Sequence, residues 1–92
     1  MNQTVKAKVV ICNQRGLHAR AAAKIVKLMN AYSADVSIVK EGMIANARSI
    51  MGLMMLGAAM GTELEIQVFG SDGDDALVAL VNLIEGKFDE DQ

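Results

Sequence analysis

The sequence predicts an α/β protein of the α+β type, a two-layer sandwich in which three helices cover one face of a four-stranded antiparallel sheet. Three observations support this fold class. The 92 residues fit a single domain, and 52 % of them are apolar, which is enough for a core without disulfides. Patterns typical of strands and helices follow one another in the order βαββαβα. The strand patterns alternate apolar and polar positions, as half-buried antiparallel strands do.

The N-terminal third of the chain is expected to form a strand and a helix. Residues 4–12 predict the strand, because apolar side chains recur at every second position. A turn follows at residues 13–16. Residues 18–30 predict an amphipathic helix, with Lys24 and Lys27 on its polar side.

Two short strands and a short helix come next. The strands are expected at residues 35–40 and about 43–47, joined by a tight turn at Glu41-Gly42. Ser49 is expected to be the N-cap of a helix that ends near Gly57, because serine is among the residues preferred at that position.

The C-terminal third predicts one more strand and one more helix. The strand, residues 62–69, has the clearest alternation in the chain, and the helix covers residues 74–86. The charged residues 87–92, called the tail below, are expected to be frayed. The buried stripe of the last helix is expected to consist of Leu77, Leu80, Val81 and Ile84.

Composition argues against several classes of function. The net charge of −2 gives no basic field for nucleic acid, and only 3 % of the residues are aromatic. Cys12 is the only cysteine, so neither a disulfide within the chain nor a cysteine zinc cluster can form. With a single histidine, a histidine-based metal site is not expected either. We therefore expect no cofactor and no metal.

The chain also lacks the patterns of targeting to or across a membrane. Lys6 and Lys8 interrupt the first strand, so the N-terminus has no apolar signal-peptide core. No stretch approaches the roughly 18 uninterrupted apolar residues of a membrane span. We expect a monomeric cytoplasmic protein.

The segment Gly16-Leu17-His18-Ala19-Arg20 indicates phosphate chemistry. It places the only histidine between a glycine turn and the start of a helix. The backbone N–H groups of Ala19 and Arg20 are then free to bind an anion, and the helix dipole favours one. A histidine ring nitrogen is a competent nucleophile, and the arginine guanidinium suits phosphate. Together these features predict a histidine that carries a phosphoryl group. Alternatively, a lone histidine before a helix is a surface residue or a cap.

The short helix after Ser49 has two apolar sides. On a helical wheel Leu53 and Leu56 lie on one side, and the opposite side, called the apolar arc below, consists of Ile50, Met51, Met54 and Met55. One side can cover the sheet, and the other must meet solvent or a partner. Because methionine suits adaptable contacts, the apolar arc predicts a docking surface. The alternative is a helix buried on all sides.

Ser49 has two interpretations. It is a helix cap, or it is also a regulatory phosphorylation site. A phosphate there would be stabilised by the helix dipole and would place about two negative charges beside the apolar arc. The neighbouring Arg48 could pair with such a phosphate.

Residues 13–20 and 49–57 resemble the two signature stretches of the HPr family, the histidine phosphocarriers of the bacterial phosphoenolpyruvate-dependent phosphotransferase system. The resemblance extends from about Val5 to Phe88. It implies an open-faced βαββαβα sandwich. It also implies that His18 accepts a phosphoryl group on Nδ1 from enzyme I and passes it to an EIIA-type domain. The protein would be a substrate of phosphotransferases rather than an enzyme.

The resemblance assigns further residues. Arg20 matches the active-site arginine, and Ser49 matches the serine that an HPr kinase/phosphorylase modifies in many members. The residues expected to dock partners are Leu17, Ile50, Met51 and Met54. The family usually has proline after the arginine, where this chain has Ala21. The ending Phe88-Asp89-Glu90-Asp91 resembles the nitrogen-related branch, NPr.

Two other functions remain open on sequence alone. One is a regulatory binding module of the nitrogen-related branch that docks partners through the Met-rich helix. The other is a small-molecule sensor on a ferredoxin-like sandwich, which no pattern of an apolar pocket supports.

Overall fold

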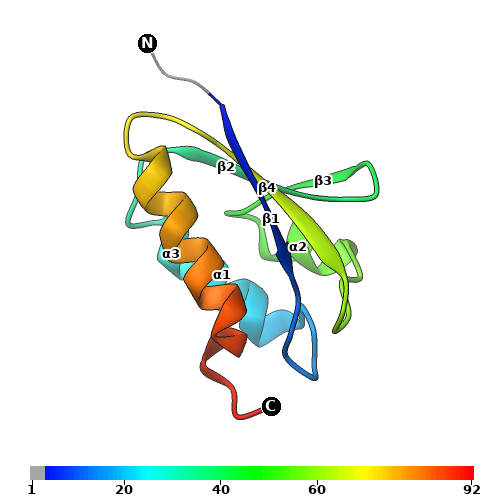
Figure 1. Cartoon of the computed structure of the whole chain (residues 1–92). Helices are drawn as coiled ribbons and strands as arrows, with labels where there is room; N and C mark the ends of the chain where they lie inside the picture. Colours follow the sequence, from blue (N-terminus) through cyan, green and yellow to red (C-terminus); the bar gives the residue numbers. More distant parts are fainter. Residues whose placement is uncertain (1–3) are drawn as a thin grey trace.

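The computed structural model describes residues 4–92 and contains every element of the expected order (Figure 1). The strands are β1 (Val5–Val10), β2 (Asp35–Lys40), β3 (Met43–Asn46) and β4 (Glu63–Phe69). The helices are α1 (Ala19–Met29), α2 (Ile50–Met55) and α3 (Gly73–Glu85), and a short 3-10 helix, η1 (Lys87–Asp89), follows α3. The predicted bounds therefore agree closely with the observed ones.

The four strands form one antiparallel sheet in the order β1-β4-β2-β3. Strand β4 lies in the middle, paired with β1 on one side and β2 on the other, and Ile66 is opposite both Ala7 and Ile38. In Figure 1 helices α1 and α3 lie side by side against one face of the sheet. The predicted fold class, an open-faced sandwich with helices on one face, is confirmed.

The core lies between the sheet and the helices, as the alternation in the strands predicts. Leu64, Ile66 and Val68 of β4 all point into it and are almost completely buried. Helix α1 contributes Ile25 and Met29, both fully buried. Burial of each such side chain stabilises the fold by about 1.5–3 kcal/mol. No helix within residues 4–92 is long and apolar enough to cross a membrane.

The buried stripe of α3 lies slightly to one side of the predicted one. Leu80 and Ile84 are fully buried as expected, but Leu77 and Val81 are only partly buried. Gly73 and Ala76 are buried in addition. A Cβ at Gly73 would lie in ordinary van der Waals contact with Val68, at 3.5 Å, so the start of α3 packs directly against β4.

The prediction of a frayed tail is wrong. Phe88 is completely buried, and the backbone turns through η1 with left-handed φ values from Lys87 to Asp89. The charged composition favours fraying, but one buried aromatic side chain outweighs it, because burying a phenylalanine stabilises by about 2–3 kcal/mol. In Figure 1 the tail ends beside the loop between β1 and α1. The two are joined by a hydrogen bond of 2.8 Å from Gln14 N to the Gln92 carbonyl.

Candidate functional site

The loop between β1 and α1 holds His18 at the start of a helix. His18 is the N-cap of α1 with an extended backbone, and its side chain makes no capping hydrogen bond, so the ring is available for other contacts. The first N–H groups of α1, those of Ala19 and Arg20 among them, have no carbonyl within the helix to bond. Both residues are exposed. This helix start can therefore bind an anion next to the histidine.

Gly16 fixes the loop against the segment that follows α2. Its φ of +67° is left-handed, and a Cβ at this position would lie 2.5 Å from the Ala58 carbonyl oxygen. The same oxygen accepts a hydrogen bond of 2.8 Å from Leu17 N. Only glycine allows this close approach, which joins the first signature stretch to the residue directly after the second.

Leu17 is not a docking residue, contrary to the prediction. It is 6 % exposed and belongs to the core. The backbone bond to Ala58 turns its side chain into the protein while the neighbouring His18 stays partly accessible, with 22 % of its side chain exposed.

The tail brings a carboxylate to the histidine. Glu90 Oε2 lies 2.5 Å from His18 Nε2, and Glu90 Oε1 accepts a hydrogen bond of 3.0 Å from Asn13 Nδ2. The hydrogen bond with His18 holds the pKa of the Glu90 carboxyl below its usual value, against the effect of desolvation, and the bond from Asn13 adds to the lowering. Glu90 is therefore ionised near neutral pH.

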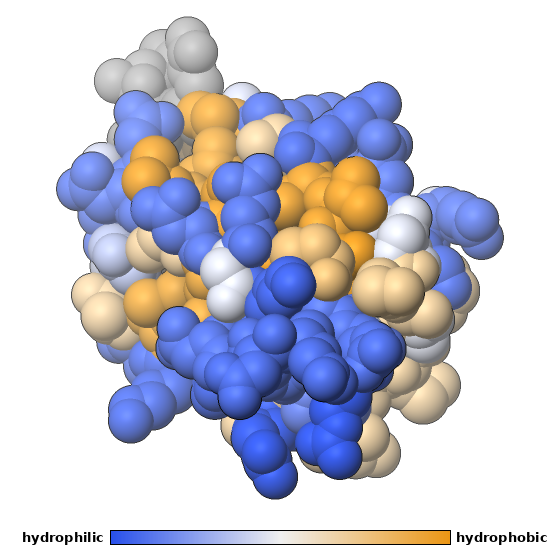
Figure 2. Space-filling view, turned by 60° about the horizontal axis from the view of Figure 1, so that its bottom comes forward, coloured by the Kyte–Doolittle hydropathy of each residue, from blue (hydrophilic) through white to orange (hydrophobic). Residues whose placement is uncertain are grey.

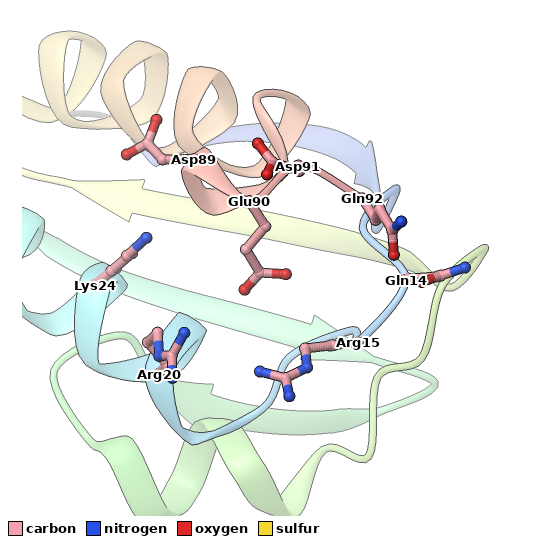
Figure 3. Close-up of a pocket in the computed structure, with 8 residues that line it drawn as sticks. All are labelled: Gln14, Arg15, Arg20, Lys24, Asp89, Glu90, Asp91 and Gln92. Atoms are coloured by element: carbon pink, nitrogen blue, oxygen red, sulfur yellow. The ribbon is translucent and has the colours of Figure 1, made fainter.

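A pocket of about 450 Å³ lies between the loop that joins β1 to α1, the start of α1, and the tail (Figure 3). Its basic side chains, Arg15, Arg20 and Lys24, come from the loop and α1, and the tail adds three carboxylates opposite them. Glu90 extends from the tail toward the two arginines in Figure 3. The view from this end of the molecule shows hydrophilic residues gathered over a broad area (Figure 2). The basic side chains of this pocket can bind an anion at the start of α1.

Arg20 is placed to supply charge to that anion. It lies two residues after His18 in the first turn of α1, is exposed and lines the pocket. Within residues 4–92 its guanidinium makes no hydrogen bond or ion pair. Ala21, where the family usually has proline, is completely buried in this same turn. The helix thus starts at Ala19 without the proline.

Helix α2 has the two sides that the wheel predicts. Leu53 and Leu56 are buried, whereas Met51 is 72 % and Met55 71 % exposed. The remaining members of the apolar arc, Ile50 and Met54, are also exposed. The alternative of a helix buried on all sides is wrong.

Ser49 caps α2 as predicted, since its Oγ accepts a hydrogen bond of 3.0 Å from Gly52 N. The sequence predicts that Arg48 could pair with a phosphate on Ser49, but its guanidinium already makes hydrogen bonds elsewhere. Its guanidinium donates to backbone carbonyls at and beyond the end of α1, Met29 O at 2.8 Å and Tyr32 O at 2.6 Å, and to Ala34 O at 2.9 Å. The arginine thus bonds carbonyls of the segment that leaves α1, where the helix can no longer supply N–H partners of its own.

Sequence reasoning missed Glu90 and the role of Asn13. Asn13 is fully buried, and its Nδ2 also donates to Gly16 O at 2.9 Å. A buried amide in a polar turn has no signature in the sequence. The one signal for Glu90 was Phe88, an aromatic residue inside a charged segment, which could have predicted that the tail is anchored.

Comparison with known proteins identifies the family of the chain. Residues 5–86 match the family model described as "PTS HPr component phosphorylation site". The chain is 39 % identical to the phosphocarrier protein HPr of Xylella fastidiosa (strain 9a5c), covering 91 % of this chain and 94 % of that protein. It is 40 % identical to the phosphocarrier protein NPr of Escherichia coli (strain K12), covering 96 % of this chain and 99 % of that protein.

A solved structure shows the same fold. HPr-C-His from Thermoanaerobacter tengcongensis matches with a TM-score of 0.91 and 39 % sequence identity, over 96 % of this chain and 99 % of that one. The family model, the relatives and this structure agree over nearly the full length. The chain therefore belongs to the HPr family of the phosphotransferase system, whose members are phosphoryl carriers rather than enzymes.

Proposed function

We propose that His18 is the phosphoryl carrier, which accepts the group on Nδ1 from phosphorylated enzyme I and passes it to an EIIA-type domain. The observation that carries the proposal is the position of His18 at the start of α1, two residues before Arg20, whose guanidinium makes no hydrogen bond or ion pair within residues 4–92. The helix N–H groups and the guanidinium together stabilise a phosphate on the ring.

The transfer needs little chemistry from the protein beyond this placement. Neutral imidazole is already a nucleophile, so the reaction needs no base to activate it. The site must hold phosphate well enough to accept it and loosely enough to release it, because binding that persists in the ground state does not lower the barrier. The partly exposed ring and the exposed Arg20 suit a group that passes between proteins.

The experiment that tests the proposal is incubation of the protein with phosphoenolpyruvate and enzyme I, followed by intact-mass measurement. We expect a mass gain of one phosphate that is lost in acid, as a phosphohistidine would be. A protein that gains no acid-labile phosphate while a known HPr does so in the same mixture would contradict the proposal.

Arg20 is expected to affect transfer more than folding. Arg20→Lys keeps the charge but loses the planar fork that binds two phosphate oxygens at once. We expect Arg20→Lys to take up phosphate about fivefold more slowly than the unaltered protein, because it loses a charge-assisted hydrogen bond. Arg20→Ala should slow the uptake further. Both melting temperatures should stay near that of the unaltered protein, because the side chain is exposed. Equal rates for the two variants would show that the charge of Arg20 does not contribute.

The apolar arc is the surface we assign to partner docking. Ile50, Met51 and Met54 lie exposed on α2, and the segment that follows α2 contacts the His18 loop at Gly16. The same surface supports a second candidate function, in which the protein regulates partners by docking alone. The two functions differ in their need for His18.

We also propose that Ser49 is a regulatory site for an HPr kinase/phosphorylase. Its Oγ caps α2 next to Ile50, so a phosphate there would add charge at the border of the apolar arc. The helix start tolerates that charge, but a partner that must exclude water from the arc would not. Phosphorylation would then block docking without unfolding the helix.

Two substitutions separate capping from regulation. Ser49→Ala removes the cap and is expected to cost ~1 kcal/mol of unfolding free energy. Ser49→Asp can still accept the bond from Gly52 N and should preserve stability, yet it should accept phosphate from enzyme I more slowly than Ser49→Ala. Thermal unfolding and the rate of phosphoryl uptake measure the two effects. If both variants take up phosphate equally fast, Ser49 is a cap alone.

A further inference from the structure

The tail is held in place on both sides of Glu90. On one side Phe88 is completely buried, and Lys24 Nζ donates to the Phe88 carbonyl at 2.5 Å. On the other side Gln14 N donates to the Gln92 carbonyl at 2.8 Å. Glu90 therefore meets the histidine from a segment with fixed ends, and its side chain is only 14 % exposed.

Asn13 fixes the Glu90 carboxylate relative to the loop that carries His18. Its Nδ2 donates both to Glu90 Oε1 at 3.0 Å and to Gly16 O at 2.9 Å. The second carboxylate oxygen is then left for the ring, where Oε2 lies 2.5 Å from His18 Nε2. One buried amide thus sets the geometry between the carboxylate and the imidazole.

The protonation state of Glu90 determines which ring nitrogen carries the proton. An ionised carboxylate has only acceptor atoms, so the contact with His18 requires the N–H to be on Nε2. A neutral imidazole has one N–H, and its other nitrogen carries the lone pair. In this arrangement that nitrogen is Nδ1.

We propose that Glu90 is a positioning residue that holds His18 in the tautomer with the proton on Nε2 and the nucleophilic lone pair on Nδ1. This inference rests on the proposed function of His18 as phosphoryl carrier. It gives the tail a part in the transfer, through the ring rather than through contact with phosphate.

The transfer step follows from that tautomer. The Nδ1 lone pair attacks the phosphorus of the phosphohistidine on enzyme I, and a new N–P bond forms. The N–P bond to the donor ring breaks, and its electron pair stays on the donor nitrogen. The proton on Nε2 stays where it is, and the positive charge that the His18 ring gains is offset by the Glu90 carboxylate. Transfer to the acceptor reverses these changes.

The first test is the tautomer itself. His18 is the only histidine, so two-bond proton–nitrogen spectra of the 15N-labelled protein, recorded at a pH where the ring is neutral, report it without ambiguity. We expect the Nε2–H pattern in the unaltered protein and a mixture of both tautomers in Glu90→Ala. Glu90→Gln keeps a single acceptor oxygen, for which Asn13 Nδ2 and His18 Nε2 compete, so we expect a smaller share of the Nε2–H form than in the unaltered protein. A main Nδ1–H form in the unaltered protein would overturn the inference.

The second test is the rate of phosphoryl uptake from enzyme I. Loss of a charge-assisted hydrogen bond to the reacting ring predicts uptake about tenfold slower in Glu90→Ala, with Glu90→Gln between it and the unaltered protein. Glu85→Gln is the matched control, because Glu85 is exposed at the end of α3 and does not line the pocket. Its tautomer and rate should not change. Thermal unfolding of all three variants identifies any loss of the folded tail.

The outcomes separate this inference from the proposed function. If the unaltered protein gains no acid-labile phosphate but shows the Nε2–H form, the carrier function fails. If it gains phosphate normally, and Glu90→Ala matches it in both tautomer and rate, the carrier function stands and the positioning role of Glu90 is wrong.

Discussion

Replacement of His18 with alanine is expected to abolish the uptake of acid-labile phosphate from enzyme I. No other side chain within residues 4–92 is an imidazole, so none can take over the same phosphoramidate chemistry. Intact-mass measurement before and after acid treatment gives the result directly. Acid lability matters because a phosphate on Ser49 would be a stable ester and would survive the treatment.

The same variant is expected to fold. His18 makes no capping hydrogen bond, so the start of α1 loses no backbone partner. The lost bond to Glu90 costs about 1 kcal/mol, which in a domain of this size lowers the melting temperature by about 4–8 °C. A matched control is Asn30→Ala, at the exposed opposite end of α1, which should keep full phosphoryl uptake. Acid-labile phosphate on the His18→Ala variant would refute the assignment of the carrier residue.

The features that the sequence predicts well are local ones. Alternation in Leu64, Ile66 and Val68 identifies β4 and its buried face, because side chains on a strand point to opposite sides. The wheel of α2 separates Leu53 from Met51 for the equivalent reason in a helix. In each case the spacing of residues along one element decides which of them are buried.

The features that it does not predict depend on single contacts between distant parts of the chain. Glu90 and His18 are 72 residues apart in sequence, and no periodicity relates them. Leu17 lies in a loop, where burial follows no repeating pattern along the sequence. Arg48 bonds carbonyls that only the folded end of α1 presents to it. Such contacts form only when the helices and strands pack together, so the pattern within any one element does not predict them.

The tail shows how one residue can reverse a compositional argument. The acidic side chains of the tail favour solvent, but the apolar Phe88 side chain is more stable in the core than in water. The burial of Phe88 then determines the position of the residues that follow it. Glu90 is placed at His18 as a consequence of that anchor. The candidate site is therefore built from the N-terminal signature together with the last residues of the chain.

Substitution of Met51 with aspartate is expected to weaken binding to enzyme I while leaving the fold intact. Met51 is 72 % exposed, so its replacement removes little buried area and should change the unfolding free energy by about 0.5 kcal/mol or less. The new carboxylate lies in the first turn of α2, where the helix dipole favours it. In the complex, however, it would have to lose its water without gaining a partner.

The cost of removing that water predicts a rise in Kd of at least about thirtyfold. This corresponds to a loss of roughly 2 kcal/mol of binding free energy, which is typical of a central interface residue. Titration calorimetry with enzyme I measures the Kd, and thermal unfolding measures stability. Met43→Asp is the matched control, since Met43 is an exposed methionine on β3, outside the apolar arc. An unchanged Kd for Met51→Asp would exclude the arc as the docking surface. A steep fall in melting temperature would instead mean that Met51 contributes to the core. Normal stability with weakened binding in Met51→Asp, and neither change in Met43→Asp, is the combination that only a docking role explains.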